Sequence, residues 1–329
     1  MRCWIWALTG RIRTGLLCAG LLCAGLLWAV ASATGAFEPG PPEVSGAVTT
    51  GEPITPLPQA PTPDPRRVSL GALLFSDTRL SRDNNRSCTT CHDVRDNGAT
   101  RRSRDSTPDG TDLSFNTTTV FNAALSFRLG WEGKYRTLES QIEALLRNPL
   151  IMGCPPETIA DKLRDDPALA GEFQAAYGRG PDPADILDAL ATFERTLITP
   201  GSRFDRWLQA DVTALSGQEV RGYSLFKSLG CIACHQGVNV GGNLYERQGI
   251  FHPLARPEPA VLRVPSLRNV ATTAPYFHDG SAPTLQIAVR RMGLAQLNTT
   301  LTDEQIEAIV AFLQTLTGTY RGAPVGARE

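Results

Sequence analysis

Two short motifs of cysteine and histidine are the residues of this chain best suited to chemistry. The chain carries Cys-Thr-Thr-Cys-His at positions 88–92 and Cys-Ile-Ala-Cys-His at positions 231–235. This spacing is the attachment signature of haem c, in which both thiols bond to the porphyrin and the histidine reaches the iron. A redox dithiol or a zinc site needs no histidine directly after the second cysteine. We therefore expect two covalent haem c groups, held by Cys88, Cys91 and His92 and by Cys231, Cys234 and His235.

The N-terminus predicts export. Basic residues precede an apolar run from Leu16 to Val30, and the small residues Ala31-Ser32-Ala33 follow it. This order is typical of a cleavable signal peptide, here residues 1–33. An uncleaved membrane anchor is the alternative, although about 15 apolar residues is short for a span. Because cytochrome c matures outside the bacterial inner membrane, we expect a periplasmic protein.

The length and net charge of the chain limit the number of domains and the kinds of partner that we expect. The chain has 329 residues and a formal net charge of −1. The length left after a signal peptide suits two domains, and the charge argues against nucleic acid as a partner. Outside the predicted signal and the two motifs, Cys154 is the one remaining thiol. We expect a buried, inert thiol there, the alternative being a redox group or ligand near a haem.

The pattern along the chain predicts an all-α protein of two cytochrome c-like haem domains packed around an interface. Gly-x-x-Leu-Phe stands at 71–75 and again at 222–226, so each domain is expected to open with a short helix before its haem motif. Further helices are predicted at Leu138–Arg147, Pro156–Asp165, Asp182–Leu197 and after the capping residue Thr302. The expected segments are an extended, loosely held arm (34–66), a first domain (67–203), a second domain (204–320) and a tail (321–329).

The sixth iron position of each haem decides its chemistry. A methionine there makes an electron carrier of raised potential, whereas an open position admits peroxide or oxygen. After the signal, the chain contains only Met152 and Met292. Met292 stands at a possible loop-to-helix position from which it could reach the second haem. A core methionine that fills a gap is an equally good interpretation.

Several longer motifs carry a resemblance to a known family. They include Asn-Thr-Thr-Thr-Val-Phe-Asn from position 116, Trp-Glu-Gly-Lys from 131, Val-Pro-Ser-Leu-Arg-Asn-Val from 264 and Ala-Pro-Tyr-Phe-His-Asp-Gly from 274. On these residues the chain resembles the bacterial dihaem cytochrome c peroxidases, which include the MauG-type enzymes. The resemblance covers about Arg67 to Gly318.

The resemblance implies unlike roles for the two haems. The His235/Met292 haem would transfer electrons, and the His92 haem would reduce peroxide. Trp131 would lie between them, carrying electrons, sealing the interface, or both. Gln141 matches a distal glutamine of the family. The resemblance also implies a calcium ion held by Asn116, Thr273, Pro275 and waters, and a homodimer.

The chain departs from the family pattern at two places. No histidine lies between His92 and His235, so the ligand that caps the peroxide-reducing haem in relatives is missing, and we expect an open first haem. Ile151 stands where relatives have the distal glutamate, and losing a positioned acid/base typically costs about 10² to 10⁴ in rate. We expect the nearby carboxylates to lie on the surface, although one of them could substitute; they are Glu139, Glu143 and Glu157. His278 is expected to be a structural hydrogen-bonder, and His252 to be exposed.

These observations favour a dihaem oxidoreductase that reduces H₂O₂ with electrons from a small cytochrome c or cupredoxin. The alternatives are a MauG-type enzyme that uses peroxide to oxidise a partner protein, and an electron-transfer protein without catalysis. The missing capping histidine favours the first alternative, whereas Met292 in place of a tyrosine ligand disfavours it. Ile151 favours the second alternative.

Overall fold

The computed structural model describes residues 51–327. The predicted signal peptide and the first part of the predicted arm lie outside these residues. Within them, none of the helices has both the length and the apolar character that crossing a membrane would require.

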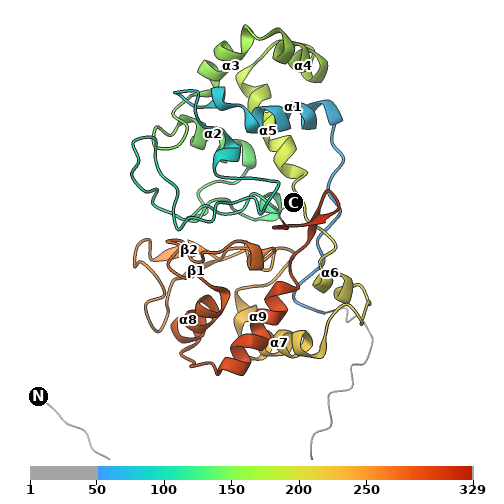
Figure 1. Cartoon of the computed structure of the whole chain (residues 1–329), viewed down its shortest axis with the longest axis vertical. Coiled ribbons are helices and arrows are strands. Elements are labelled where there is room, and N and C mark those ends of the chain that lie inside the picture. Colours follow the sequence, from blue (N-terminus) through green and yellow to red (C-terminus); the bar gives the residue numbers. More distant parts are fainter. Residues whose placement is uncertain (1–50, 328–329) are drawn as a thin grey trace, which may run out of the picture. The chain divides into compact units, whose positions relative to one another are not determined.

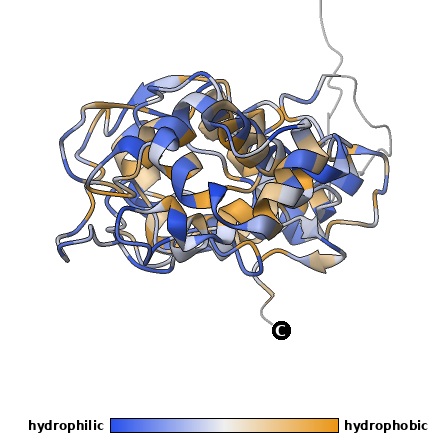
Figure 2. Ribbon diagram, turned by 90° about the horizontal axis from the view of Figure 1, so that it is seen from above, coloured by the Kyte–Doolittle hydropathy of each residue, from blue (hydrophilic) through white to orange (hydrophobic). Residues whose placement is uncertain are grey.

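The described chain is mostly helical, and each of its halves places one haem motif among helices (Figure 1). The first half contains α1 (Pro65–Ser76), α2 (Leu138–Arg147), α3 (Pro156–Arg164), α4 (Pro167–Tyr177) and α5 (Pro183–Arg195). The second half contains α6 (Arg203–Leu208), α7 (Gly217–Ser228), α8 (Leu285–Leu297) and α9 (Asp303–Gln314). Single helices carry both hydrophobic and hydrophilic residues, as the colours of Figure 2 show.

The remaining elements are short. The haem motifs begin in the 3₁₀ turns η2 (Cys88–Thr90) and η4 (Cys231–Ala233). Antiparallel pairs form between β1 (Tyr245–Arg247) and β2 (Val261–Arg263), and between β3 (Thr319–Tyr320) and β4 (Ala323–Pro324). The all-α prediction is therefore confirmed, with small two-stranded additions. The predicted helix Leu138–Arg147 has the bounds of α2, and the Thr302 cap precedes α9 in a capping box with Gln305.

One glycine in each half allows two helices to cross closely. A Cβ atom added at Gly71 of α1 would lie 2.1 Å from the main-chain oxygen of Ala189 in α5. The same addition at Gly222 of α7 would lie 1.9 Å from the main-chain oxygen of Ala308 in α9. The crossing of α1 with α5 is therefore equivalent to the crossing of α7 with α9.

Replacing Gly71 with alanine should destabilise the protein. Because the obstructing atom is a backbone oxygen, the helices must move apart, and overpacking of this kind typically costs about 1–3 kcal/mol. Gly171 in α4 is the matched control, since a Cβ atom there would meet nothing within 4 Å. Gly171→Ala should leave the stability unchanged or raise it by about 0.4–1 kcal/mol. Denaturant unfolding of both variants checks the difference, and equal stabilities would contradict the close crossing.

The prediction of a loosely held arm is wrong for its described part. Ile54 and Leu57 are buried at 1% and 5% exposure, and Ile54 joins the core of the second half. The main-chain oxygen of Thr55 accepts a hydrogen bond of 2.8 Å from Arg268. The sequence lacks a periodic pattern here because single apolar residues, rather than a helix face, insert into the core.

The C-terminal segment, which follows the second half, packs against the core of the first half. Val325 is buried in the core of the first half, and the Tyr320 ring lies 5.0 Å from that of Phe121. The arm therefore contacts the second half and the tail contacts the first, so each terminal segment bridges the two halves.

The two halves contain equivalent copies of one structural unit, a loop that leads into a helix. It begins at a left-handed asparagine (Asn122 or Asn269) and ends at a helix N-cap threonine with nearly the same backbone angles (Thr137 or Thr284). Between these points each copy forms a β-bridge, Leu129 with Tyr135 and Tyr276 with Ala282. Residues the same number of positions after these asparagines are structurally equivalent. By this count α2 corresponds to α8, and the equivalent residues are Trp131 and His278, Gln141 and Ala288, and Leu145 and Met292.

Candidate haem and electron-transfer site

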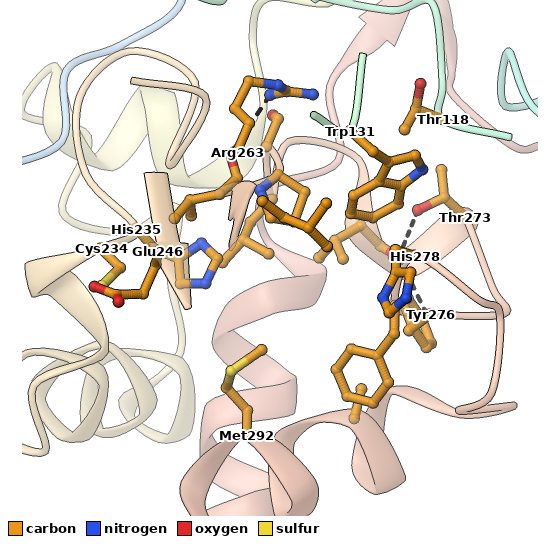
Figure 3. Close-up of a pocket in the computed structure, with 18 of the residues that line it drawn as sticks. Thr118, Trp131, Cys234, His235, Glu246, Arg263, Thr273, Tyr276, His278 and Met292 are labelled. Atoms are coloured by element: carbon orange, nitrogen blue, oxygen red, sulfur yellow. Dashed lines mark hydrogen bonds between the residues drawn. The ribbon is translucent and has the colours of Figure 1, made fainter. Parts of the chain in front are cut away.

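A largely apolar cavity surrounds the second haem motif. Cys231, Cys234 and His235 line it together with Met292 of α8. His235 and Met292 reach the cavity from different elements, as Figure 3 shows. Apolar side chains of α8 and α9 complete this part of the wall, among them Leu285, Ile309 and Leu313. A flat apolar macrocycle with one histidine and one thioether ligand fits this donor set.

Both motif histidines are prepared to bind iron through Nε2. Nδ1 of His92 donates to the main-chain oxygen of Gly98 at 3.0 Å, and Nδ1 of His235 donates to that of Val240 at 3.4 Å. A carbonyl oxygen can only accept, so the remaining nitrogen of each ring carries the free lone pair. Burial lowers the pKa of His235 to about 4 and also lowers the pKa of His92. Both imidazoles are therefore neutral at pH 7, as an iron ligand must be.

The four motif cysteines do not have the properties of a redox dithiol. Burial raises the pKa of Cys91 to about 12 and that of Cys231 to about 11, and it also raises the pKa values of Cys88 and Cys234. Reactive dithiols need at least one thiol with a lowered pKa. The buried surroundings of the four cysteines therefore argue against a thioredoxin-like function. They suit thiols that become thioethers when haem is attached.

Met292 lies well inside α8, so the expectation of a loop-to-helix position is wrong. The helix continues to Leu297, where Asn298 caps it in a left-handed conformation and donates its backbone N–H to the main-chain oxygen of Gly293. From this helix Met292 still faces the cavity that His235 lines. Its binding to iron stays a prediction that this placement permits.

The first half has a leucine at the position that corresponds to Met292. Leu145 lies the same number of residues after the start of α2 as Met292 does after the start of α8. Both side chains are half-buried. Since leucine has no donor atom, α2 offers no iron ligand at the position where α8 carries Met292. Sequence analysis missed Leu145, because the two halves align only through their backbone conformations.

Trp131 lies where the two halves meet. Its indole Nε1 donates to the main-chain oxygen of Asn116 at 2.8 Å, and its own main-chain oxygen accepts from the Arg263 backbone at 2.9 Å. It lines the same cavity as His235 and Met292 (Figure 3). Trp131 is thus bonded to the first half through its indole and to the second half through its main chain, at the place where an electron path between the halves would run.

His278 is a structural hydrogen-bonder, as predicted, because its ring bonds to the main chain of Glu258. Its ring lies 6.3 Å from that of Trp131, and its main-chain oxygen accepts from the Asn116 backbone at 2.7 Å. The side chain is buried, yet its Nε2 atom has no hydrogen-bond partner. The main chain of His278 thus connects the halves, and its side chain, with one unpaired ring nitrogen, belongs to the cavity wall. His252 is exposed, as predicted.

The residues expected near the first haem lie in different surroundings. Gln141 of α2 lines the cavity, and Ile151 packs against the core cluster that Cys88 also contacts. Cys154 is buried in that core at 1% exposure, in agreement with an inert thiol. The three nearby carboxylates are all ion-paired, Glu139 with Arg195 and both Glu143 and Glu157 with Arg147. These ion pairs agree with the expectation of carboxylates at the helix surface.

The three residues expected to bind calcium lie on one cavity wall. Asn116, Thr273 and Pro275 all line it. The Asn116 amide donates to the main-chain oxygens of Arg102 and Ser103, at 3.1 and 3.0 Å, which leaves its Oδ1 atom to accept. In residues 51–327 no cluster of three or more His, Cys, Asp or Glu side chains could hold a metal ion. A cation on this wall would therefore depend on amide and carbonyl oxygens, which suit calcium.

Comparison with known proteins identifies the family. Residues 65–213 match the family described as di-haem cytochrome c peroxidase, and residues 219–317 match cytochrome c. The chain is 37% identical over 290 residues to the cytochrome c551 peroxidase of Nitrosomonas europaea, covering 83% of this chain and 86% of that protein. The chain belongs to the di-haem cytochrome c peroxidase family.

Two further relatives of this di-haem peroxidase family member support the same family assignment. The cytochrome c peroxidase Ccp of Escherichia coli is 39% identical over 287 residues, which cover 82% of this chain but 62% of that protein. A solved MauG-like protein associated with microbial copper homeostasis is 26% identical, with a TM-score of 0.68 over 80% of this chain and 93% of the other. Membership of the family assigns two haem c groups to the chain, and the predicted fold of two cytochrome c-like domains is confirmed.

Proposed function

We propose that this protein is an exported dihaem peroxidase that reduces H₂O₂ to water with electrons from a small redox protein. Electrons would enter at the haem of His235 and Met292, pass Trp131, and reach the haem of His92. When bound, the haem supplies the iron at which the O–O bond of peroxide breaks. The chain's own residues hold the two sites in fixed relation, exclude water and orient the substrate through Gln141.

A single observation carries this proposal: Met292 faces the second haem cavity while its counterpart in the first half is Leu145. A haem with a methionine ligand serves electron transfer, and a haem with an open sixth position serves peroxide chemistry. The absence of a histidine between His92 and His235 supports the same division. The first haem would then need no prior reduction to admit peroxide.

The test is the oxidation of a reduced donor by peroxide. The purified dihaem protein should oxidise a reduced small cytochrome c or cupredoxin when H₂O₂ is added, with two donor molecules consumed per peroxide. The proposal would be contradicted if the donor were oxidised while no peroxide was consumed. It would also be contradicted if peroxide were consumed at the same rate with and without the donor. Recovery of the mature protein from the periplasmic fraction, cleaved near Ala33, tests the proposed export.

A MauG-type function is the second candidate, and the missing capping histidine favours it. One of the solved relatives is named as a MauG-like protein. Such an enzyme would use peroxide to oxidise a partner protein, so it would consume peroxide without a small electron donor. Met292 weighs against this candidate, because a methionine ligand favours the reduced state of the second haem.

We further propose that the wall formed by Asn116, Thr273 and Pro275 binds one calcium ion. Calcium added to chelator-treated protein should raise the free energy of unfolding by about 2.7 kcal/mol at 100 times the dissociation constant. Thermal or denaturant unfolding measures the change. Asn116→Ala should abolish the calcium-dependent part, whereas Asn148→Ala, a control at the end of α2, should retain it. A gain that is equal in both variants would place the ion elsewhere.

A further inference from the structure

Glu194 near the C-terminal end of α5 has no role in the reaction described so far. The residue precedes Arg195, the last residue of the helix. Its carboxylate has no hydrogen bond or ion pair with any residue that the structure describes. An unpaired carboxylate inside a protein is costly unless it serves a purpose or remains protonated.

The repeat of the fold places Glu194 at the first haem. Gly71 packs against Ala189 and Phe193, in the same way that Gly222 packs against Ala308 and Phe312. The residue after each phenylalanine is therefore equivalent, so Glu194 corresponds to Leu313. Leu313 lines the cavity of the second haem together with His235 and Met292.

The electrostatic contacts of Glu194 agree with this placement. Burial raises the pKa of the Cys88 thiol, which will carry the first haem, and the charge of Glu194 raises that pKa further. It is also coupled to Glu139 of α2, the helix equivalent to the one that carries Met292. Glu194 therefore lies within electrostatic range of both the attachment point of the first haem and helix α2.

The surroundings of Glu194 favour the neutral carboxylic acid. Burial raises its pKa to about 8, although the side chain is only half-buried by accessible surface. A haem attached at Cys88 would add a large apolar group near this carboxyl, which reinforces the effect.

Few charged groups can offset this preference. Arg195 lowers the pKa of Glu194, but its guanidinium is paired with Glu139, which itself raises that pKa. The Cys88 thiol becomes an uncharged thioether on haem attachment. The other elements packed against α5 direct their charges elsewhere: Arg67 of α1 to Asp188 and Tyr177, and Glu157 of α3 to Arg147. The short turn η3 (Ala123–Leu125) has no charged side chain.

We propose that Glu194 is the proton-transfer residue of the first haem site, in place of the carboxylate that Ile151 replaces. This inference rests on the proposed function and deepens it. Reduction of H₂O₂ to two waters consumes two electrons, which the donor protein supplies, and two protons. Protonated Glu194 gives one proton to the departing oxygen as the O–O bond breaks, and its carboxylate then takes up another proton from solvent.

The test compares Glu194→Gln and Glu194→Leu with the exposed control Glu172→Gln. Leucine is the residue that the second half carries at this position, and glutamine keeps the shape of the side chain without its proton. Intact haem content and an unchanged second-haem spectrum will show that each variant has folded.

The first readout is the rate constant for reaction with H₂O₂ in a stopped-flow instrument. In the wild-type protein this rate should fall as pH rises through about 8, because only the protonated acid donates. Both Glu194 variants should react about 10² to 10⁴ times more slowly and should lose this pH dependence. Glu172→Gln should match the wild type.

The second readout needs no turnover. The reduction potential of the first haem should fall with rising pH in the wild type, because reduction favours protonation of a nearby acid. This slope should disappear in Glu194→Gln. Wild-type rates and an unchanged slope in Glu194→Gln would overturn the inference. If the wild type does not reduce peroxide, the proposed function fails, and the slope alone then decides whether Glu194 exchanges a proton with the first haem.

Discussion

The Leu145→Met variant should lose most of its reaction with H₂O₂ while it keeps both haems. Leu145 occupies the position in α2 that Met292 occupies in α8, after N-cap threonines with nearly identical backbone angles. A methionine introduced there should reach the first haem as Met292 is proposed to reach the second. Exchange of leucine for methionine typically costs less than about 1.5 kcal/mol, so the variant should fold.

The size of the effect follows from the strength of the new bond. A sulfur ligand that holds the iron by about 3 kcal/mol leaves about 1% of the protein open to peroxide, since each 1.4 kcal/mol is a factor of ten. The stopped-flow rate with H₂O₂ should therefore fall about 100-fold.

Leu146→Met is the matched control for this variant. It adds the same side chain to the same helix, but Leu146 faces the core at 2% exposure. This control should react like the wild type. A Leu145→Met variant that reacts at the wild-type rate would show that α2 does not cover the open face of the first haem.

The Met292→Leu variant should lose electron entry rather than peroxide access. Loss of a sulfur ligand lowers the potential of a haem, and axial ligation sets potentials over a range of about 0.8 V. A fall on the order of 100 mV, at about 59 mV per factor of ten for one electron, reduces the reduced fraction about 50-fold. Turnover with a reduced cytochrome should fall by a similar factor.

Potentiometric titration followed by absorption checks this expectation. The control is Met152→Leu, which changes the buried methionine of the first half. Its second-haem potential should equal that of the wild type. An unchanged second-haem potential in Met292→Leu would show that this methionine fills a core gap and binds no iron.

Local sequence signals predicted much of the fold. The helix Leu138–Arg147 was predictable because Thr137 caps it and apolar residues recur on one face. The closing helix was predictable from its capping box. By contrast, α4 and α8 were not predicted as helices, and the Pro-rich segment around Ile54 proved to be well packed. Its burial depends on contacts with distant residues such as Arg268, which no local pattern reveals.

The candidate site was predictable where it depends on motif residues and not where it depends on the repeat. The haem motifs and Trp131 stand in recognisable sequence patterns. Leu145 and Glu194 became visible only when backbone conformation and helix crossing aligned the two halves. Phe193-Glu194 and Phe312-Leu313 share one residue type, a signal too weak to use before the glycine contacts identified the crossing.

The most direct test of the account is the number of cyanide ions that the fully oxidised protein binds. The far face of the first haem is expected to be open beneath Leu145, and that of the second to be closed by Met292. A spectroscopic titration should therefore show one cyanide bound rapidly per two haems, with the spectrum of the other haem unchanged. Rapid binding of two cyanide ions, or of none, would contradict the division of labour between the two haems.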